Sequence, residues 1–170
     1  MNPGTVPQLA APALSFALNL GIGALAGLAA ALAMTLPVRR QSEGFSPAYV
    51  AASVFRRKKP DEVSARDANV AHHATGAVAG ALYAAVFSAL SVVVPGLGRV
   101  AGVALLPHLL AVGVVVLLVY ASYAYVVLPR AKSAIYEDQS TAVRGQWLRS
   151  SLVFGVTLTL IAPVLWSIAA

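Results

Sequence analysis

Four long apolar runs divide this chain, and the one charged residue within them is Arg149, near the start of the fourth. They cover about residues 14–38, 71–94, 100–128 and 147–169. As a helix with a rise of about 1.5 Å per residue, each run is long enough to cross a hydrocarbon core about 30 Å thick. Only 11% of the 170 residues are charged and 59% are hydrophobic, whereas soluble domains carry about 25% charged residues. We therefore expect an all-α integral membrane protein, a four-helix bundle that forms a single transmembrane domain over residues 1–170.

The basic residues predict how these spans are oriented. Eleven of the twelve Lys and Arg side chains lie in or beside the connections 39–70 and 129–146, and the short connection between the second and third spans holds only Arg99. Positive charge collects in cytoplasmic connections. The expected topology is therefore N-out and C-out, with connections 39–70 and 129–146 in the cytoplasm of a cell (inner, cytoplasmic) membrane. The uncharged N-terminal lead lacks the basic start of a secretory signal peptide, which favours a retained first span.

The first connection contains a segment too short to span. Residues 46–55 begin with Ser-Pro, which is typical of a helix start, and then offer an apolar side, so we expect a short interfacial helix there. The cluster Arg56, Arg57, Lys58 and Lys59 follows it directly. These charges either set the topology alone or also contact anionic lipid headgroups. Next, Pro60-Asp61-Glu62 predicts the N-terminus of the second helix.

Small residues recur at helical spacing on the first two long helices. Gly23 and Gly27 lie on one face of the first, and Gly76 and Gly80 on one face of the second. Small residues let helix backbones approach closely in membranes. We expect the two faces to pack against each other, with His73 at the polar end of the contact.

Five other side chains in the spans have expected local roles. Pro107 and Pro163 each remove a helical hydrogen bond, which predicts two kinks. Asn19 is expected to bond a neighbouring helix. Trp147 and Trp166 bracket the fourth span at the positions that aromatic residues prefer near the membrane interfaces.

Sequence motifs for chemistry are absent. The chain has no Cys, no phosphate-binding Gly-rich loop and no nucleophile–base arrangement, so we expect no enzyme, no catalytic residue and no metal site. The net charge of +6 lies between apolar runs without a nucleic-acid-binding module, so nucleic acid is not an expected partner. His73 and His108 are the candidates for a single haem or pigment ligand. Opposite helix directions should separate them by roughly 15–20 Å in depth. The simpler roles are a polar cap for His73, and for His108 a bond to the carbonyl freed by Pro107 or contact with outer-leaflet water.

The segment AHHATGAVAGALY, residues 71–83, resembles the second helix of small uncharacterised bundle membrane proteins. In those families a His–small–Gly–xxx–Gly–xx–Tyr pattern recurs, here on His73, Gly76, Gly80 and Tyr83. The resemblance covers roughly residues 20–90, and the second half departs from it with Arg149-Ser150-Ser151. It implies a helical inner-membrane protein of unassigned activity.

Three functions are compatible with these patterns. The leading hypothesis is a non-catalytic accessory or structural subunit that packs in a larger membrane complex or with copies of itself, in contact with anionic lipids. The second is a small carrier or channel with a lumen of hydroxyl, Tyr and His side chains. The third is a haem- or pigment-binding subunit that uses one histidine.

Overall fold

A computed structural model describes the backbone of residues 10–39, 46–130 and 134–169, and the side chains of 14–35, 47–130 and 141–169. Within these ranges the helices are joined by short turns and loops, and the only strands are those of one two-stranded ribbon. Four helical segments are long and apolar enough to cross a membrane. The all-α prediction is therefore confirmed.

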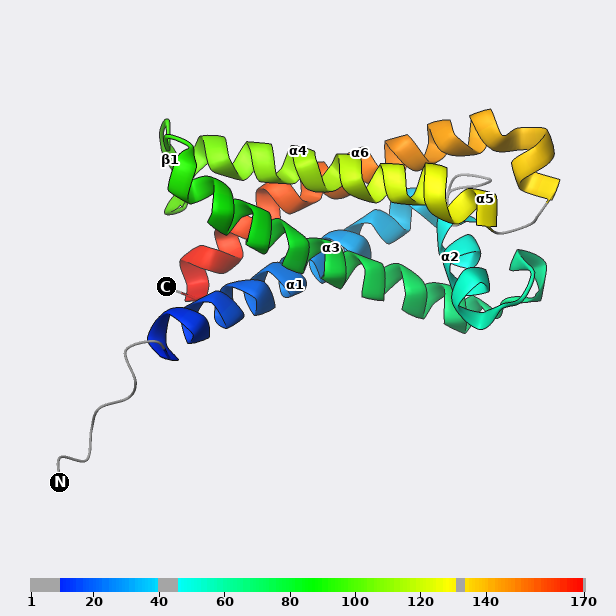
Figure 1. The fold of residues 1–170 in the computed structure, drawn as a ribbon, viewed down its shortest axis with the longest axis horizontal. Helices are drawn as coiled ribbons and strands as arrows, with labels where there is room; N and C mark the ends of the chain where they lie inside the picture. The colour runs from blue at the N-terminus through cyan, green and yellow to red at the C-terminus, as the bar shows by residue number, and fades with distance from the viewer. Residues whose placement is uncertain (1–9, 40–45, 131–133, 170) are drawn as a thin grey trace, which may run out of the picture.

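The four long helices form a bundle of two layers (Figure 1). One layer holds α1 (Ala10–Arg39) and α3 (Ala65–Val93); the other holds α4 (Leu105–Ala121) and α6 (Ala134–Ala169). Each long helix packs on two of the others. Helix α1 contacts α3 and α6, and α4 also contacts α3 and α6. The start of α1 and the end of α6 lie at one end of the bundle, because four passes return the chain to the side where it began (Figure 1).

The short helix α2 (Ser46–Arg56) lies across the other end of the bundle, which we call the α2 end (Figure 1). Arg57 follows it with a left-handed φ of 56°, and the Lys58 N–H bonds the Ser53 carbonyl at 3.0 Å. This pattern is a Schellman cap with arginine where glycine is usual. The segment expected to be a short helix is thus a helix. Its location at a membrane interface stays a prediction.

The second long helix does not begin at Pro60. Residues 60–62 form a separate 3-10 turn, η1 (Pro60–Glu62), and the chain is extended at Val63 and Ser64. Ser64 is the N-cap of α3, since its Oγ accepts a hydrogen bond from the Asp67 N–H at 3.1 Å. A serine with an extended backbone satisfies a free N–H of the first turn, which the proline could not do.

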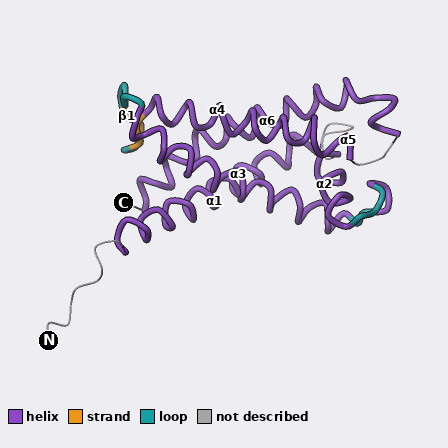
Figure 2. The backbone as a smooth tube through the Cα atoms, viewed as in Figure 1, coloured by secondary structure: helices purple, strands orange, loops and turns teal. Residues whose placement is uncertain are grey.

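The third long helix begins at Leu105, five residues later than the apolar run suggests. Residues 99–104 form the ribbon β1 (Arg99–Val100) and β2 (Val103–Ala104), the strand pair in Figure 2. Gly98 and Gly102 take φ values of 94° and 82°, which only glycine adopts without strain. We call this the hairpin end of the bundle. Pro107 is consequently the third residue of α4, in the turn whose N–H groups have no helical partner, so it breaks no hydrogen bond.

The last helices also differ from the expected runs. A π-helical segment, η2 (Ser122–Val127), follows α4 and leads into α5 (Leu128–Arg130). Helix α6 begins at Ala134, inside the expected polar connection, so Trp147 lies well within it. Trp147 is 2% exposed, against Val50, Leu128 and Val143. Trp147 is therefore packed inside the protein under α2, and its position near a membrane interface stays a prediction.

Candidate functional site

The polar interior of the hairpin half centres on His108. Its Nδ1 lies 2.6 Å from the Tyr83 hydroxyl and its Nε2 lies 3.1 Å from the Thr159 carbonyl oxygen. Both Tyr83 and His108 are buried, at 0% and 2% exposure. Three helices, α3, α4 and α6, therefore meet through one imidazole.

The proton positions follow from these partners. A carbonyl oxygen only accepts, so Nε2 carries the hydrogen and donates it to Thr159. A buried ring without a counter-charge stays neutral, so Nδ1 accepts from the Tyr83 hydroxyl. Both nitrogens are engaged, and neither is available to ligate iron in this arrangement. His108 thus fits the haem hypothesis poorly.

Pro163 explains why Thr159 needs this bond. The residue four positions after a helical carbonyl normally donates to it, and for Thr159 that residue is Pro163, which has no N–H. His108 supplies the missing donor. The expected cap on a carbonyl freed by Pro107 is therefore wrong: Pro107 sits in a first turn, and the free carbonyl belongs to another helix.

Aromatic rings fill the space around His108. The Tyr83 ring lies edge-on to His108 and to Trp166, with centroids 5.6 Å and 5.8 Å apart, and it stacks on Phe87 at 6.0 Å. The Trp166 Nε1–H donates to the Asn19 Oδ1 at 3.2 Å. The expected bond from Asn19 to a neighbouring helix is confirmed. The rings and the Asn19 bond join α1, α3, α4 and α6 in the hairpin half.

A cavity of about 70 Å³ lies in the α2 half of the bundle, large enough for about two water molecules. Apolar groups and the backbone form most of its wall. The Thr75 Oγ1 and the Tyr123 hydroxyl, 2.8 Å apart, close one side. The other described polar or aromatic side chains that line it are His72, Trp147, Ser150, Ser151 and Phe154. Among the described residues, the lining has hydroxyls and rings but no Asp, Glu, Lys or Arg, and this part of the wall suits a neutral molecule.

The π-helical segment η2 positions Tyr123 in this wall. Pro129 stands five residues after Ala124 and cannot donate the hydrogen bond that a π-helix requires. The Arg144 Nε–H instead donates to the Ala124 carbonyl at 3.3 Å, and its guanidinium lies 5.0 Å from the centre of the Tyr125 ring. A side chain of α6 thus satisfies a carbonyl of α4's extension, as His108 of α4 does for α6.

The adjacent histidines point to different partners. The His72 Nε2 lies 3.1 Å from the Ala31 carbonyl of α1, so His72 contacts α1 directly; the role of His73 as a polar cap of the helix contact stays a prediction. The His73 Nδ1 lies 2.8 Å from the Asn69 carbonyl of its own helix. The buried His73 Nε2 and Asn69 Oδ1 have no hydrogen-bond partner among the described residues.

The four predicted glycines lie together where α1 crosses α3. A Cβ built on Gly80 would approach the Gly27 nitrogen at 2.6 Å and overlap the Gly23 carbonyl oxygen. A Cβ on Gly76 would lie 2.5 Å from the Ala31 Cβ. Real Cβ atoms do not make such contacts, so this crossing accepts only glycine at Gly80.

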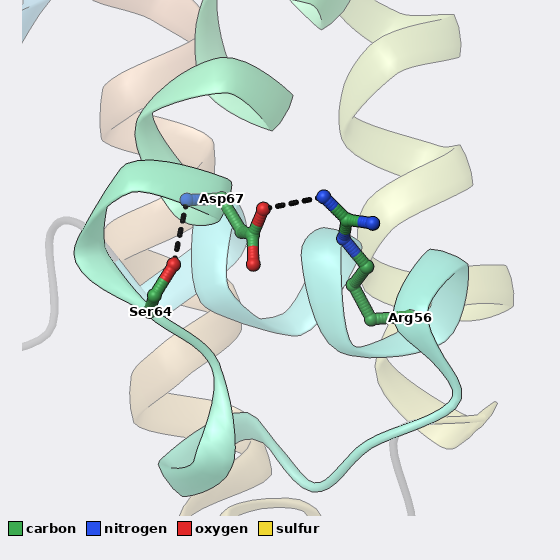
Figure 3. Close-up of polar contacts among 3 residues, drawn as sticks. All are labelled: Arg56, Ser64 and Asp67. Atoms are coloured by element: carbon green, nitrogen blue, oxygen red, sulfur yellow. Dashed lines mark hydrogen bonds and ion pairs between the residues drawn. The ribbon is translucent and has the colours of Figure 1, made fainter.

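The basic cluster lies at the end of α2, on the surface. The Arg56 Nη2 donates to the Asp67 Oδ1 of α3 at 2.7 Å (Figure 3). Asp67 lies in the polar first turn of α3, before the apolar stretch begins. The hydrogen bonds from Arg56 and then from Ser64 lower the pKa of Asp67 below its usual value. Arg57, Lys58 and Lys59 are exposed, and none forms an ion pair with another described residue.

Sequence reasoning did not single out Tyr83, Tyr123 or Trp166 as interior polar groups. Tyr83 carries a signal, since Gly76, Gly80 and Tyr83 share a helical face. Nothing in the sequence pairs Tyr83 with His108. Among the described side chains, no group of three His, Asp or Glu could hold one metal ion.

Comparison of this chain with models of known protein families, with curated proteins and with solved structures gives no match. The fold and the interior therefore define the class by themselves. It is an all-helical protein with four helices able to cross a membrane.

Proposed function

We propose that this protein is a non-catalytic multi-pass membrane protein, a subunit that packs in a larger membrane assembly or with copies of itself. In this proposal the α2 end faces the cytoplasm of a cell membrane and both termini lie outside, because the basic residues collect at the α2 end.

The proposal is supported by the interior polar groups, because they bond to one another between helices. His108 bonds Tyr83 and Thr159, Trp166 bonds Asn19, and Thr75 bonds Tyr123. These groups join helices, and rings fill the hairpin half, which leaves little polar chemistry for a reaction or a continuous passage. The outer apolar face of α4, in contrast, is exposed at Leu109, Leu117 and Leu118, so the helix has surface for lipid or for another subunit.

Mass measurement tests the assembly. The tagged protein is extracted from its native membrane in a mild detergent, and light scattering gives the protein mass of the particle. We expect a mass well above one chain of 17.5 kDa, with partners identified by co-purification. A particle that holds one chain alone, at native expression level, contradicts the proposal.

The α2-end cavity favours a carrier as the second candidate. It opens in one half of the bundle while rings close the other, which is the shape of one state in alternating access. Uptake of small neutral solutes into proteoliposomes that depends on the Tyr123 hydroxyl would support this function. Uptake equal to that of empty liposomes would exclude it for the solutes tested.

His73 keeps the third function open, because its buried Nε2 has no partner among the described residues. An axial haem or pigment ligand would give the purified protein a visible absorption band that His73→Ala removes. A protein without such a band after purification from its native membrane contradicts this role.

A further inference from the structure

A groove on the outer surface between α2 and α3 has an apolar floor and a polar end formed by the Arg56–Asp67 ion pair, and three further basic residues follow Arg56 along the chain. Its volume is about 370 Å³, within the usual range of about 300–1,000 Å³ for ligand sites. Its walls come from Phe55 of α2 and from Val70, Ala74 and Val78 of α3, while Arg56 and Asp67 stand at its polar end. From Asp67 to Val78 the groove follows α3 for about 16 Å at the helical rise.

The apolar wall of the groove faces outward, and its side chains are exposed among the residues that the structure describes. Phe55 is 81% exposed and Val78 is 69% exposed. Side chains of this size are stable in that position when hydrocarbon surrounds them. Between the larger side chains of this wall, Ala71 and Ala74 leave room because their side chains are small.

The basic residues that follow Arg56, next to the polar end of the groove, favour an anionic ligand. Arg56 is neutralised by Asp67 at 2.7 Å, but Arg57, Lys58 and Lys59 follow it directly and are exposed. The acids Asp61 and Glu62 are also exposed on η1, so positive charge exceeds negative charge here by a modest margin. Lys and Arg near a membrane surface attract anionic headgroups, at about a fivefold gain in binding for each charge.

We infer that this groove binds one anionic phospholipid, with an acyl chain along Phe55, Val70 and Val78 and the phosphate against Lys58 and Lys59. The Arg56–Asp67 pair separates the two parts of the ligand and ties α2 to α3 at the groove. The inference does not depend on the assembly proposed above, because a single chain can carry the site.

Lipid retention measured by native mass spectrometry tests the charge. The protein is released from nanodiscs that contain equal amounts of phosphatidylglycerol and phosphatidylcholine with identical acyl chains. We expect phosphatidylglycerol to be retained at least about fivefold more than phosphatidylcholine. Lys58→Gln/Lys59→Gln should remove this preference, whereas Lys58→Arg/Lys59→Arg should keep it. Asp67→Asn should strengthen it, because Arg56 then loses its counter-charge.

Filling the groove tests the acyl chain. Ala74→Leu should reduce the retention of both lipids, while Ala89→Leu, at an exposed position of α3 outside the groove, should not. Equal retention of the two lipids by the unaltered protein overturns the inference. So does an equal effect of the two Leu variants, or a dimer that Ala74→Leu alone dissociates, because a second copy would then cover the groove.

Discussion

His108 of α4 donates a hydrogen bond to a backbone carbonyl of a different helix, α6. The Thr159 carbonyl lacks a donor because Pro163 has no N–H, and the His108 Nε2 supplies one from α4. Arg144 serves the Ala124 carbonyl in the same way, beside Pro129. A polar group left unpaired in an apolar interior costs free energy, so these contacts fix how α4 and α6 sit against each other.

Substitution of Tyr83 tests the imidazole network. Tyr83→Phe leaves the His108 Nδ1 buried without a donor and should destabilise the protein by about 1 kcal/mol, the usual size of such bonds between membrane helices. Thermal unfolding in detergent measures the change. Tyr125→Phe is the control, since Tyr125 is exposed and its ring still faces Arg144. An equal decrease in unfolding temperature in both variants would contradict the stabilising bond between Tyr83 and His108.

A second substitution tests which proline leaves free the carbonyl that His108 bonds. His108→Leu leaves the Thr159 carbonyl without its donor and should lower the unfolding temperature. In a Pro163→Ala background the restored N–H can bond Thr159, so His108→Leu should cost less there. A Pro107→Ala background should give no such rescue, because Pro107 stands in the first turn of α4. Rescue in the Pro107→Ala background, and none in the Pro163→Ala background, would show that His108 bonds a carbonyl freed by Pro107.

At the scale of elements, the close crossing of α1 and α3 depends on glycines, which have no side chain to separate the two backbones. Gly80 lies against the backbone of Gly23 and Gly27, closer than any Cβ allows. Gly113, on the exposed side of α4, has nothing within 4 Å of a built Cβ. Both glycines are equal as local helix residues, so their difference is one of packing.

A pair of alanine substitutions separates packing from helix propensity. Gly80→Ala should destabilise the protein by roughly 1–3 kcal/mol through overpacking. Gly113→Ala should leave stability unchanged or raise it by less than about 1 kcal/mol. Unfolding curves of the two variants, with His73→Ala as a further control at the same helix pair, make the comparison. Equal tolerance of alanine at both glycines would contradict the close crossing.

Much of the element level could be predicted from the sequence. The four long helices follow from apolar length, and the glycine spacing picked out residues that do lie at the α1–α3 crossing. The starts of α3 and α4 and the length of α6 could not be predicted, because the Ser64 cap, the 99–104 ribbon and the cover of α2 over Trp147 each depend on local backbone bonds or on contacts between distant segments.

For the whole molecule, the structure brings both ends of the described bundle to the hairpin end (Figure 1). The orientation in a membrane is a prediction from charge. Because the chain has no Cys, single cysteines report accessibility without further changes. A membrane-impermeant maleimide added to intact cells should label Val100→Cys at the hairpin end and not Glu62→Cys at the α2 end. Labelling of Glu62→Cys alone would invert the topology.

The sequence by itself determined the helical class, the four long helices and the positions of the charges, because each depends on composition over a short run of neighbouring residues. Only the tertiary structure decided which polar groups meet. His108 lies 25 positions from Tyr83 and 51 positions from Thr159 along the chain, and no local pattern links the three residues. The physical reason is that a carbonyl freed by a proline must find a donor, and only helix packing determines which side chain is near enough to provide it.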